Sequence, residues 1–310
     1  MEEKKKPTTL SAWKGMSLSR QAPVVLFLLF LASAVIFHLA CWAKHQAPLN
    51  VGIVALAMLS MLAISIWHSL LIKGAKATAA FFIICFLLSW FCEYIGHNRG
   101  WFFGSYRYTS TLGPAIGGVP VLITVTWSVI IYSAFMLIDW LVGMKGGVKA
   151  RTWWGRSARS ALSAAATATL VCAWDLVVDP VATSGAWWTA AGKDPWWYWL
   201  YGGPYLRELP GKPGLGAPGV PMGNFVGWWL AAFFVVFIFS LFFQRPNRLA
   251  GGPLDLLPLG VYFYLYFTVV LVALEMNWHV PGMNQVALIG TFTMMPVIAV
   301  SLVKLAWDYT

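Results

Sequence analysis

Charged residues are scarce in this sequence. Asp, Glu, Lys and Arg make up 10% of its 310 residues, whereas hydrophobic residues make up 59%. A soluble domain of this length carries roughly 25% charged residues. The scarcity excludes an ordinary soluble domain, and the long apolar runs that accompany it are typical of a membrane protein.

Cysteine pairs and nucleotide-binding motifs are also missing. The four cysteines form no Cys-x-x-Cys pair, so we expect small core hydrophobes rather than disulfides or metal ligands. No GxGxxG motif, P-loop or flavin fingerprint is present. The widely spaced histidines supply no recognisable metal-ligand pattern, and His38, His45 and His68 are expected to be structural. The sequence therefore predicts neither a cofactor nor a metal.

Long apolar segments are what the sequence does have. A membrane-spanning helix needs about 20 such residues. Eight segments qualify: Pro23–Ala43, Val51–Leu71, Ala77–Ile95, Val119–Leu141, Ala158–Val178, Phe225–Phe243, Leu259–Asn277 and Gln285–Ala306. They predict an all-α, polytopic transmembrane bundle, with a basic N-terminal arm at residues 1–22 and one catalytic domain at residues 23–310.

Residues 180–224 fit neither a helix nor a linker. They are rich in Gly, Pro and Trp, and flexible linkers lack such aromatic residues. Trp favours the boundary between lipid and water, where its ring is buried and its N–H stays wet. We therefore expect an aromatic loop cap that lies at one membrane surface.

The distribution of Lys and Arg predicts the orientation. With the N-terminus inside, 15 of the 21 Lys and Arg residues fall in inner segments and six in outer loops. This bias predicts a cell-membrane protein with both termini in the cytoplasm. Because the basic residues lie in short loops between apolar runs, topology explains the net charge of +10, and no nucleic-acid partner is expected.

Five acidic residues lie within or at the ends of the predicted spans. A carboxylate there costs free energy unless it is paired, protonated or facing water, so each is a candidate functional residue. Asp139 lies toward the inner face, where we expect a structural pairing with the basic segment 145–159. The other four lie toward the outer face: Glu93, Asp175, Asp179 and Glu275.

Asp175 and Asp179 are four residues apart and therefore share one helical face. Two carboxylates so close cannot both ionise easily away from bulk water, so one is expected to keep a proton that it can donate. The alternative is that Asp179 is only a solvated helix end before Pro180. Glu93 and Glu275 have the same alternative, as helix ends that reach toward water.

An aromatic loop follows Glu93. In residues 98–120, Tyr106 and Tyr108 alternate with Arg107. Such a loop can hold aromatic faces over a cavity, with Arg99 or Arg107 pairing the buried acids. Its alternative is an aromatic belt at the membrane surface. His97 is four residues beyond Glu93, although Gly96 can already end the helix between them.

These segments resemble the carotenoid 1,2-hydratase family of the CruF type. The similarity of order and spacing covers roughly residues 80–280, and the first two spans match only in character. The resemblance implies a cofactor-independent membrane hydro-lyase that adds water across the terminal 1,2 double bond of an acyclic carotenoid end. The matching pieces are Glu93-Tyr94-Ile95-Gly96, Gly100, Phe103-Gly104-Ser105-Tyr106-Arg107-Tyr108, Gly118-Val119-Pro120, Trp127, Asp175-Leu176-Val177-Val178-Asp179-Pro180, Trp187-Trp188, Gly219-Val220-Pro221 and Asn224-Phe225-Val226-Gly227-Trp228.

The residues suit that chemistry. Hydration of an isolated trisubstituted alkene begins with a proton from a strong acid, which leaves a tertiary carbocation. Aromatic faces stabilise such a cation, and a second carboxylate or His can deprotonate the incoming water. We assign proton donation to Asp179 coupled to Asp175, and the water to Glu93. The predicted substrate-binding residues are Tyr94, Tyr106, Tyr108, Trp127, Trp174, Trp188, Asn224 and Trp228, and the supporting residues are Arg107, His97 and Glu275.

The expected partners are a carotenoid, lycopene-like or monocyclic with an acyclic end, together with water, membrane lipid and other enzymes of carotenoid synthesis. Two other classes stay open. A membrane prenyltransferase uses two Asp-rich sites to hold Mg²⁺ and diphosphate, and only Asp175-xxx-Asp179 resembles one of them. A proton-coupled transporter carries acids through the midplane, whereas these acids gather at one end.

Overall fold

The computed structural model describes residues 15, 17–44, 51–142, 152–190, 192–209, 211, 214–243, 254 and 256–309. Within these ranges, eight helices are long and apolar enough to cross a membrane, and each overlaps one predicted span. They are α2 (Leu18–Ala43), α3 (Val51–Ile72), α4 (Ala75–Arg99), α5 (Val121–Leu141), α6 (Trp153–Thr183), α8 (Met222–Phe242), α9 (Leu256–Met276) and α10 (Met283–Tyr309). The predicted transmembrane helical bundle is confirmed, and the chain is a multi-pass membrane protein.

Most of the basic N-terminal arm, residues 1–14 and 16, lies outside the described residues, and so does His45. The expectations for this arm and for a structural role of His45 therefore stay predictions.

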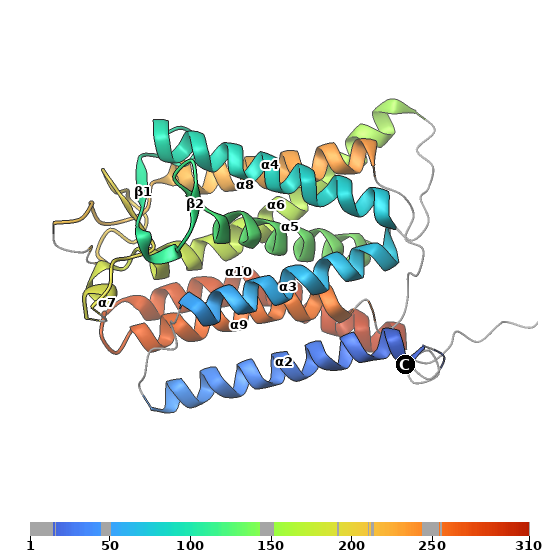
Figure 1. Cartoon of the computed structure of the whole chain (residues 1–310), viewed down its shortest axis with the longest axis horizontal. Helices are drawn as coiled ribbons and strands as arrows, with labels where there is room; N and C mark the ends of the chain where they lie inside the picture. Colours follow the sequence, from blue (N-terminus) through green and yellow to red (C-terminus); the bar gives the residue numbers. More distant parts are fainter. Residues whose placement is uncertain are drawn as a thin grey trace, which may run out of the picture.

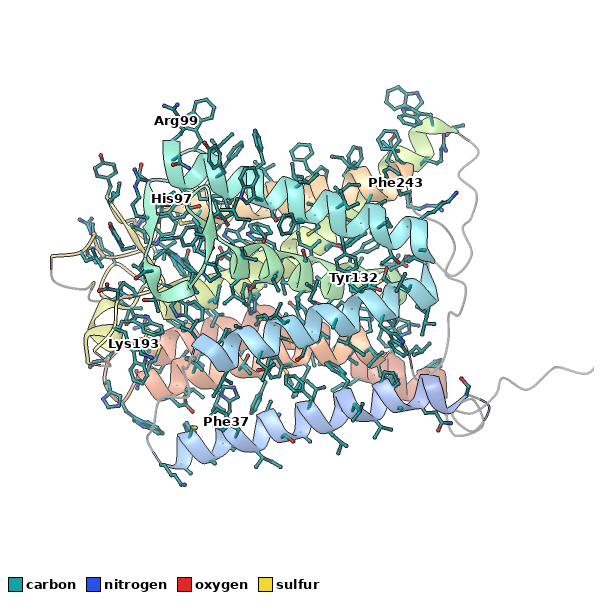
Figure 2. All side chains as sticks on the ribbon, in the orientation of Figure 1. Phe37, His97, Arg99, Tyr132, Lys193 and Phe243 are labelled. Carbon is teal, nitrogen blue, oxygen red and sulfur yellow. The ribbon has the colours of Figure 1, made fainter. Side chains whose placement is uncertain are left out.

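Short elements gather at one end of the bundle. Figure 1 shows the long helices side by side along one axis, with β1, β2 and α7 at one end and the C-terminus at the other. We call the first the cap end. Its elements are β1 (Tyr106–Tyr108), η1 (Ser110–Leu112), β2 (Ala115–Ile116), β3 (Val119–Pro120), α7 (Gly185–Ala190) and β4 (Trp197–Trp199). Figure 2 places His97 and Lys193 there as well.

Helices α5 and α6 form the centre of the bundle. In the most apolar 18-residue stretch of α5, 78% of the residues are buried. Helix α6 packs against α5, α8, α9 and α10. By contrast, α2 lies at the edge and packs mainly against α9. Only 11% of its most apolar 18-residue stretch is buried. Most of α2 is therefore a lipid-facing surface.

The cap is held together by pairing between two distant loops. Strand β1 pairs with β4 in antiparallel register, with Tyr106 opposite Trp199 and Tyr108 opposite Trp197. The Thr109 amide extends this pairing by donating to the Trp196 carbonyl at 3.1 Å. Alternate residues of a strand point to opposite faces, so the two tyrosines share one face of the ribbon.

The cap begins later than the sequence predicted, because α6 continues through Pro180 to Thr183. A proline inside a helix leaves the carbonyl four residues earlier without its usual donor. Here that carbonyl belongs to Leu176, and the Tyr205 hydroxyl of the cap donates to it at 2.7 Å. Asp179 is therefore not a solvated helix end but a residue inside the last turns of α6.

Gly96 does not end α4, which runs to Arg99 and closes at Gly100 with a left-handed φ of 72°. Gly96 instead lets the aromatic loop lie directly on the helix. A Cβ atom at this position would be 2.7 Å from Cδ2 of Phe103 and 3.0 Å from the Tyr106 hydroxyl. The missing side chain thus keeps Tyr106 within reach of Glu93, one turn earlier on α4.

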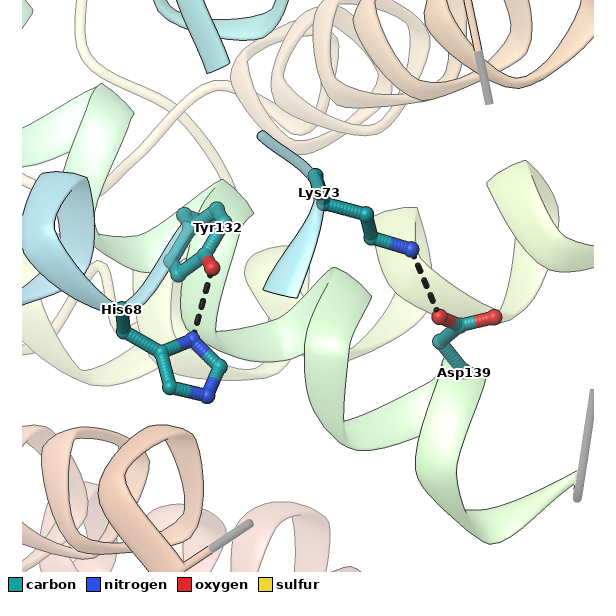
Figure 3. A network of polar contacts seen from close by, with 4 residues as sticks. All are labelled: His68, Lys73, Tyr132 and Asp139. Atoms are coloured by element: carbon teal, nitrogen blue, oxygen red, sulfur yellow. Dashed lines mark hydrogen bonds and ion pairs between the residues drawn. The ribbon is translucent and has the colours of Figure 1, made fainter. Parts of the chain in front are cut away.

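A separate polar network lies toward the opposite end (Figure 3). Lys73 Nζ and Asp139 Oδ2 form an ion pair of 2.9 Å, and both side chains are buried. Beside it, a hydrogen bond of 2.7 Å joins His68 Nδ1 and the Tyr132 hydroxyl. Asp139 thus has a structural partner in Lys73; of the basic segment that the sequence suggested, residues 145–151 lie outside the described residues.

Candidate active site

Glu93 is buried in α4 and held by three donors. Its Oε2 atom accepts hydrogen bonds from the hydroxyls of Tyr106 and, at 2.7 Å, Tyr108. Its Oε1 atom accepts one from the indole N–H of Trp127 on α5, at 2.9 Å. Three donors satisfy most of a carboxylate's capacity, which makes burial of this charge tolerable. The structure therefore brings together Glu93 and three of the predicted substrate-binding residues.

The two tyrosines act as donors because they keep their protons. Burial, reinforced by the neighbouring Glu93, raises the pKa of Tyr106 and of Tyr108 well above the usual value. His97 supports this arrangement, since its ring stacks on Tyr108 with centroids 5.7 Å apart.

Among the described residues, Arg107 forms no ion pair with an acid, contrary to the expectation from sequence. Its guanidinium donates to the backbone carbonyls of His97 and Tyr106, at 2.8 Å for the latter. Arg107 therefore fastens β1 to the end of α4, which holds Tyr106 and Tyr108 in place.

Asp175 and Asp179 form a second cluster with Asn224. The Asn224 Nδ2 atom donates to Asp175 Oδ2 at 2.8 Å and to Asp179 Oδ2 at 2.6 Å. The indole N–H of Trp197 on β4 donates to Asp179 Oδ1 at 2.7 Å. The two aspartates are 0% and 1% exposed, and Asp175 Oδ1 has no hydrogen-bond partner in the described part of the chain.

No cation balances these carboxylates among the residues that the structure describes. The ion pair of the bundle, Lys73–Asp139, belongs to the network near the other end. A group of buried acids without a cation is costly if all are charged.

Aromatic rings join the two clusters. Trp127, which donates to Glu93, stacks on Trp228 of α8 with centroids 3.7 Å apart and an interplanar angle of 13°. Trp228 in turn lies 6.1 Å from Trp174, the neighbour of Asp175. On the cap side, Tyr108 meets Trp197 edge to face at 6.0 Å.

An apolar cavity of about 100 Å³ adjoins this site. Its wall includes Trp174, Trp197 and Trp228, so the indoles that contact the acid clusters also face the cavity. The acids themselves lie behind this aromatic wall. The remaining lining residues come from α2, α3, α5, α6, α9 and the cap: His38, Val54, Ala57, Met58, Leu112, Leu122, Ile123, Thr126, Val178, Val181, Trp196, Tyr264, Thr268, Val269 and Val272.

Three predicted site residues lie apart from the acid clusters. Tyr94 is 40% exposed and stacks on Trp90, so it faces away from the acids. Trp188 donates to the Val181 carbonyl at 3.2 Å and holds α7 onto α6. Glu275, near the end of α9, is 1% exposed, and neither of its carboxyl oxygens has a hydrogen-bond partner within the ranges that the structure describes.

Trp197 contacts Asp179 but is not among the residues that the sequence predicts for the site. The sequence does contain a signal for a strand pair here. Residues 196–199 read Trp-Trp-Tyr-Trp, and Tyr106-Arg107-Tyr108 has the alternation of a short strand. Pairing these two segments would have brought Trp197 and Tyr108 together at one end of the bundle.

Comparisons with known proteins identify the family of the chain. The family model described as "Carotenoid biosynthesis protein" matches residues 51–297. A bisanhydrobacterioruberin hydratase from Haloarcula japonica is 28% identical over 162 residues, which cover 52% of this chain and 44% of that relative. No solved structure matches the chain. Since the family model matches well over half of the sequence, the chain belongs to the carotenoid biosynthesis protein family.

Proposed function

We propose that this protein is a carotenoid hydratase. It adds water across the terminal 1,2 double bond of an acyclic carotenoid end, gives a tertiary alcohol, and uses no cofactor. The observation that carries the proposal is the buried Asp175–Asp179 pair, without a cation among the described residues, beside an apolar cavity with an aromatic wall. The family and the hydratase relative support the substrate class.

The aspartate pair supplies the proton. Two buried carboxylates that share the amide of Asn224 are most stable when they hold one proton between them. Asp179, coupled to Asp175, gives this proton to the less substituted carbon of the double bond. The π bond breaks, a C–H bond forms, and the positive charge rests on the tertiary carbon.

The aromatic wall and Glu93 stabilise that cation. The faces of Trp174, Trp197 and Trp228 border the cavity, and aromatic faces attract positive charge. We assign Glu93, behind the Trp127–Trp228 stack, the role of a carboxylate that stabilises the cation. The sequence assigned the water to Glu93, but its three donors favour this electrostatic role. The cavity accommodates one end of a carotenoid, and the rest of the polyene would lie among lipid chains.

The product is the direct test of this function. Expression in a lycopene-accumulating host is expected to yield carotenoids heavier by about 18 mass units for each hydrated end, which mass spectrometry of the pigments detects. Purified protein in detergent is expected to perform the same conversion without additives. Activity that appears only after a nucleotide, flavin or metal is supplied would exclude the proposed mechanism, and a Mg²⁺ and diphosphate requirement would favour a prenyltransferase.

We further propose that residues 23–310 form one catalytic domain and that the cap end faces away from the cytoplasm. The bias of Lys and Arg supports this orientation. Reporter fusions after Leu141 and Thr310 should then report a cytoplasmic location, and a fusion after Ala43 the other side. A C-terminal reporter on the outside would reverse the orientation and place the acids at the inner membrane surface.

A further inference from the structure

Three residues that line the cavity carry buried nitrogen atoms. His38 on α2 is 9% exposed, and its Nδ1 atom has no hydrogen-bond partner among the residues that the structure describes. The same holds for the indole N–H groups of Trp174 and Trp196. Buried polar groups normally have partners, so an imidazole without one at the edge of an apolar cavity calls for an explanation.

Glu275 lies where α9 packs on the helix that carries His38. On α2, Trp42 is one turn beyond His38, and its ring lies 5.7 Å from that of Trp278, which follows Glu275 by three residues. On α9, Glu275 lies three residues beyond Val272, which lines the cavity. A buried carboxyl group and a buried imidazole, neither with a hydrogen-bond partner among the described residues, therefore occur on neighbouring parts of α2 and α9.

We propose that His38, beside the carboxyl group of Glu275, binds the attacking water and accepts its proton. This inference rests on the proposed hydration and names a residue for the step that follows protonation. His38 lines the cavity, whereas Glu93 already accepts three hydrogen bonds. The sequence alone predicts a structural role for His38.

The step balances as follows. The water oxygen bonds to the tertiary carbon, and one of its protons moves to the neutral imidazole. The carbon becomes a tertiary alcohol, the histidine becomes an imidazolium, and the aspartate pair is left one proton short. Transfer of that proton from His38 back to the aspartate pair through water restores the starting state, so the net change is the addition of one water.

His38 lies on the helix that precedes the family match, which begins at residue 51. The proposed water site is thus completed by an element outside the matched region. The proposed role of His38 therefore applies to this chain and not to the family as a whole.

The test is carried out in D₂O and measures protonation of the alkene separately from addition of water. The full-length protein in detergent receives an acyclic carotenoid, and mass spectrometry follows the hydrated product and the deuterium in recovered substrate. In His38→Gln and His38→Leu, protonation continues but the cation returns to alkene by losing a proton. Hydration is expected to fall by about 10²–10⁴-fold, the usual contribution of a general base, while deuterium still enters the substrate.

Ser33→Ala, on the exposed face of the same helix, is the matched control and should hydrate like the wild type. Near-normal hydration in both His38 variants would overturn the proposal. Joint loss of hydration and deuterium entry would also overturn it, because His38 would then serve binding or folding. A wild-type protein that forms no alcohol at all would reject the proposed function itself, a result that the variants cannot mimic.

Discussion

Asp179→Asn is expected to abolish hydration while the protein stays folded. Asparagine has nearly the same size as aspartate and still accepts a hydrogen bond from Trp197, but it cannot donate the proton that starts the reaction. Loss of such a proton transfer usually lowers the rate by about 10²–10⁴-fold. The measurement is hydrated carotenoid formed per amount of monodisperse protein in detergent.

The deuterium experiment adds a second criterion for this variant. Because no cation forms, Asp179→Asn should lose deuterium entry together with hydration, unlike the His38 variants. Asp194→Asn makes the same chemical change in the cap, outside the acid clusters, and should remain active. Turnover near the wild-type level in Asp179→Asn would remove the aspartate pair from the mechanism.

The second large effect is expected on stability, at the other end of the bundle. Asp139→Leu removes the partner of Lys73 and leaves a buried, unpaired ammonium group. Breaking a buried ion pair from one side usually costs about 3–5 kcal/mol. Thermal unfolding in detergent should therefore occur at a clearly lower temperature in this variant than in the wild type.

The double variant Lys73→Met/Asp139→Leu tests the reason for that loss. It removes both charges and replaces them with apolar groups, so it should recover most of the stability, because such replacements are often neutral. The proposed hydration should also survive, since the pair lies far from the acid clusters along the bundle. A double variant less stable than Asp139→Leu would show that the cost does not come from an unpaired charge.

The spans could be predicted closely because they depend on local information. A run of about 20 apolar residues is visible without any knowledge of neighbouring helices. The alternating direction of successive spans predicts that Glu93, Asp175 and Asp179 lie at one end of the bundle. The structure places Tyr106, Tyr108, Trp127 and Asn224 in contact with these acids, and their roles at the site stay predictions.

Other parts depended on contacts that no local pattern contains. Pro180 suggests a helix end, and only the Tyr205 hydroxyl from the cap explains why α6 continues. Trp197 reaches Asp179 through the pairing of β1 with β4, two strands of three residues each that are too short for a strong alternation signal. His38 looked unremarkable because a cavity wall formed by α2 and α9 has no sequence motif.

The distance along the chain between each acid and its hydrogen-bond donors also determines the order in which the two acid clusters can form during synthesis. All donors to Glu93 come from residues within 34 positions of it, so this cluster can close soon after α5 has been synthesised. The aspartate pair must wait for Asn224, which follows Asp179 by 45 residues. At ordinary translation rates of about 5–20 residues per second, Asp175 and Asp179 spend several seconds in the nascent chain before their amide partner emerges. During insertion these two acids are the part of the bundle that most needs water or a helper protein beside it.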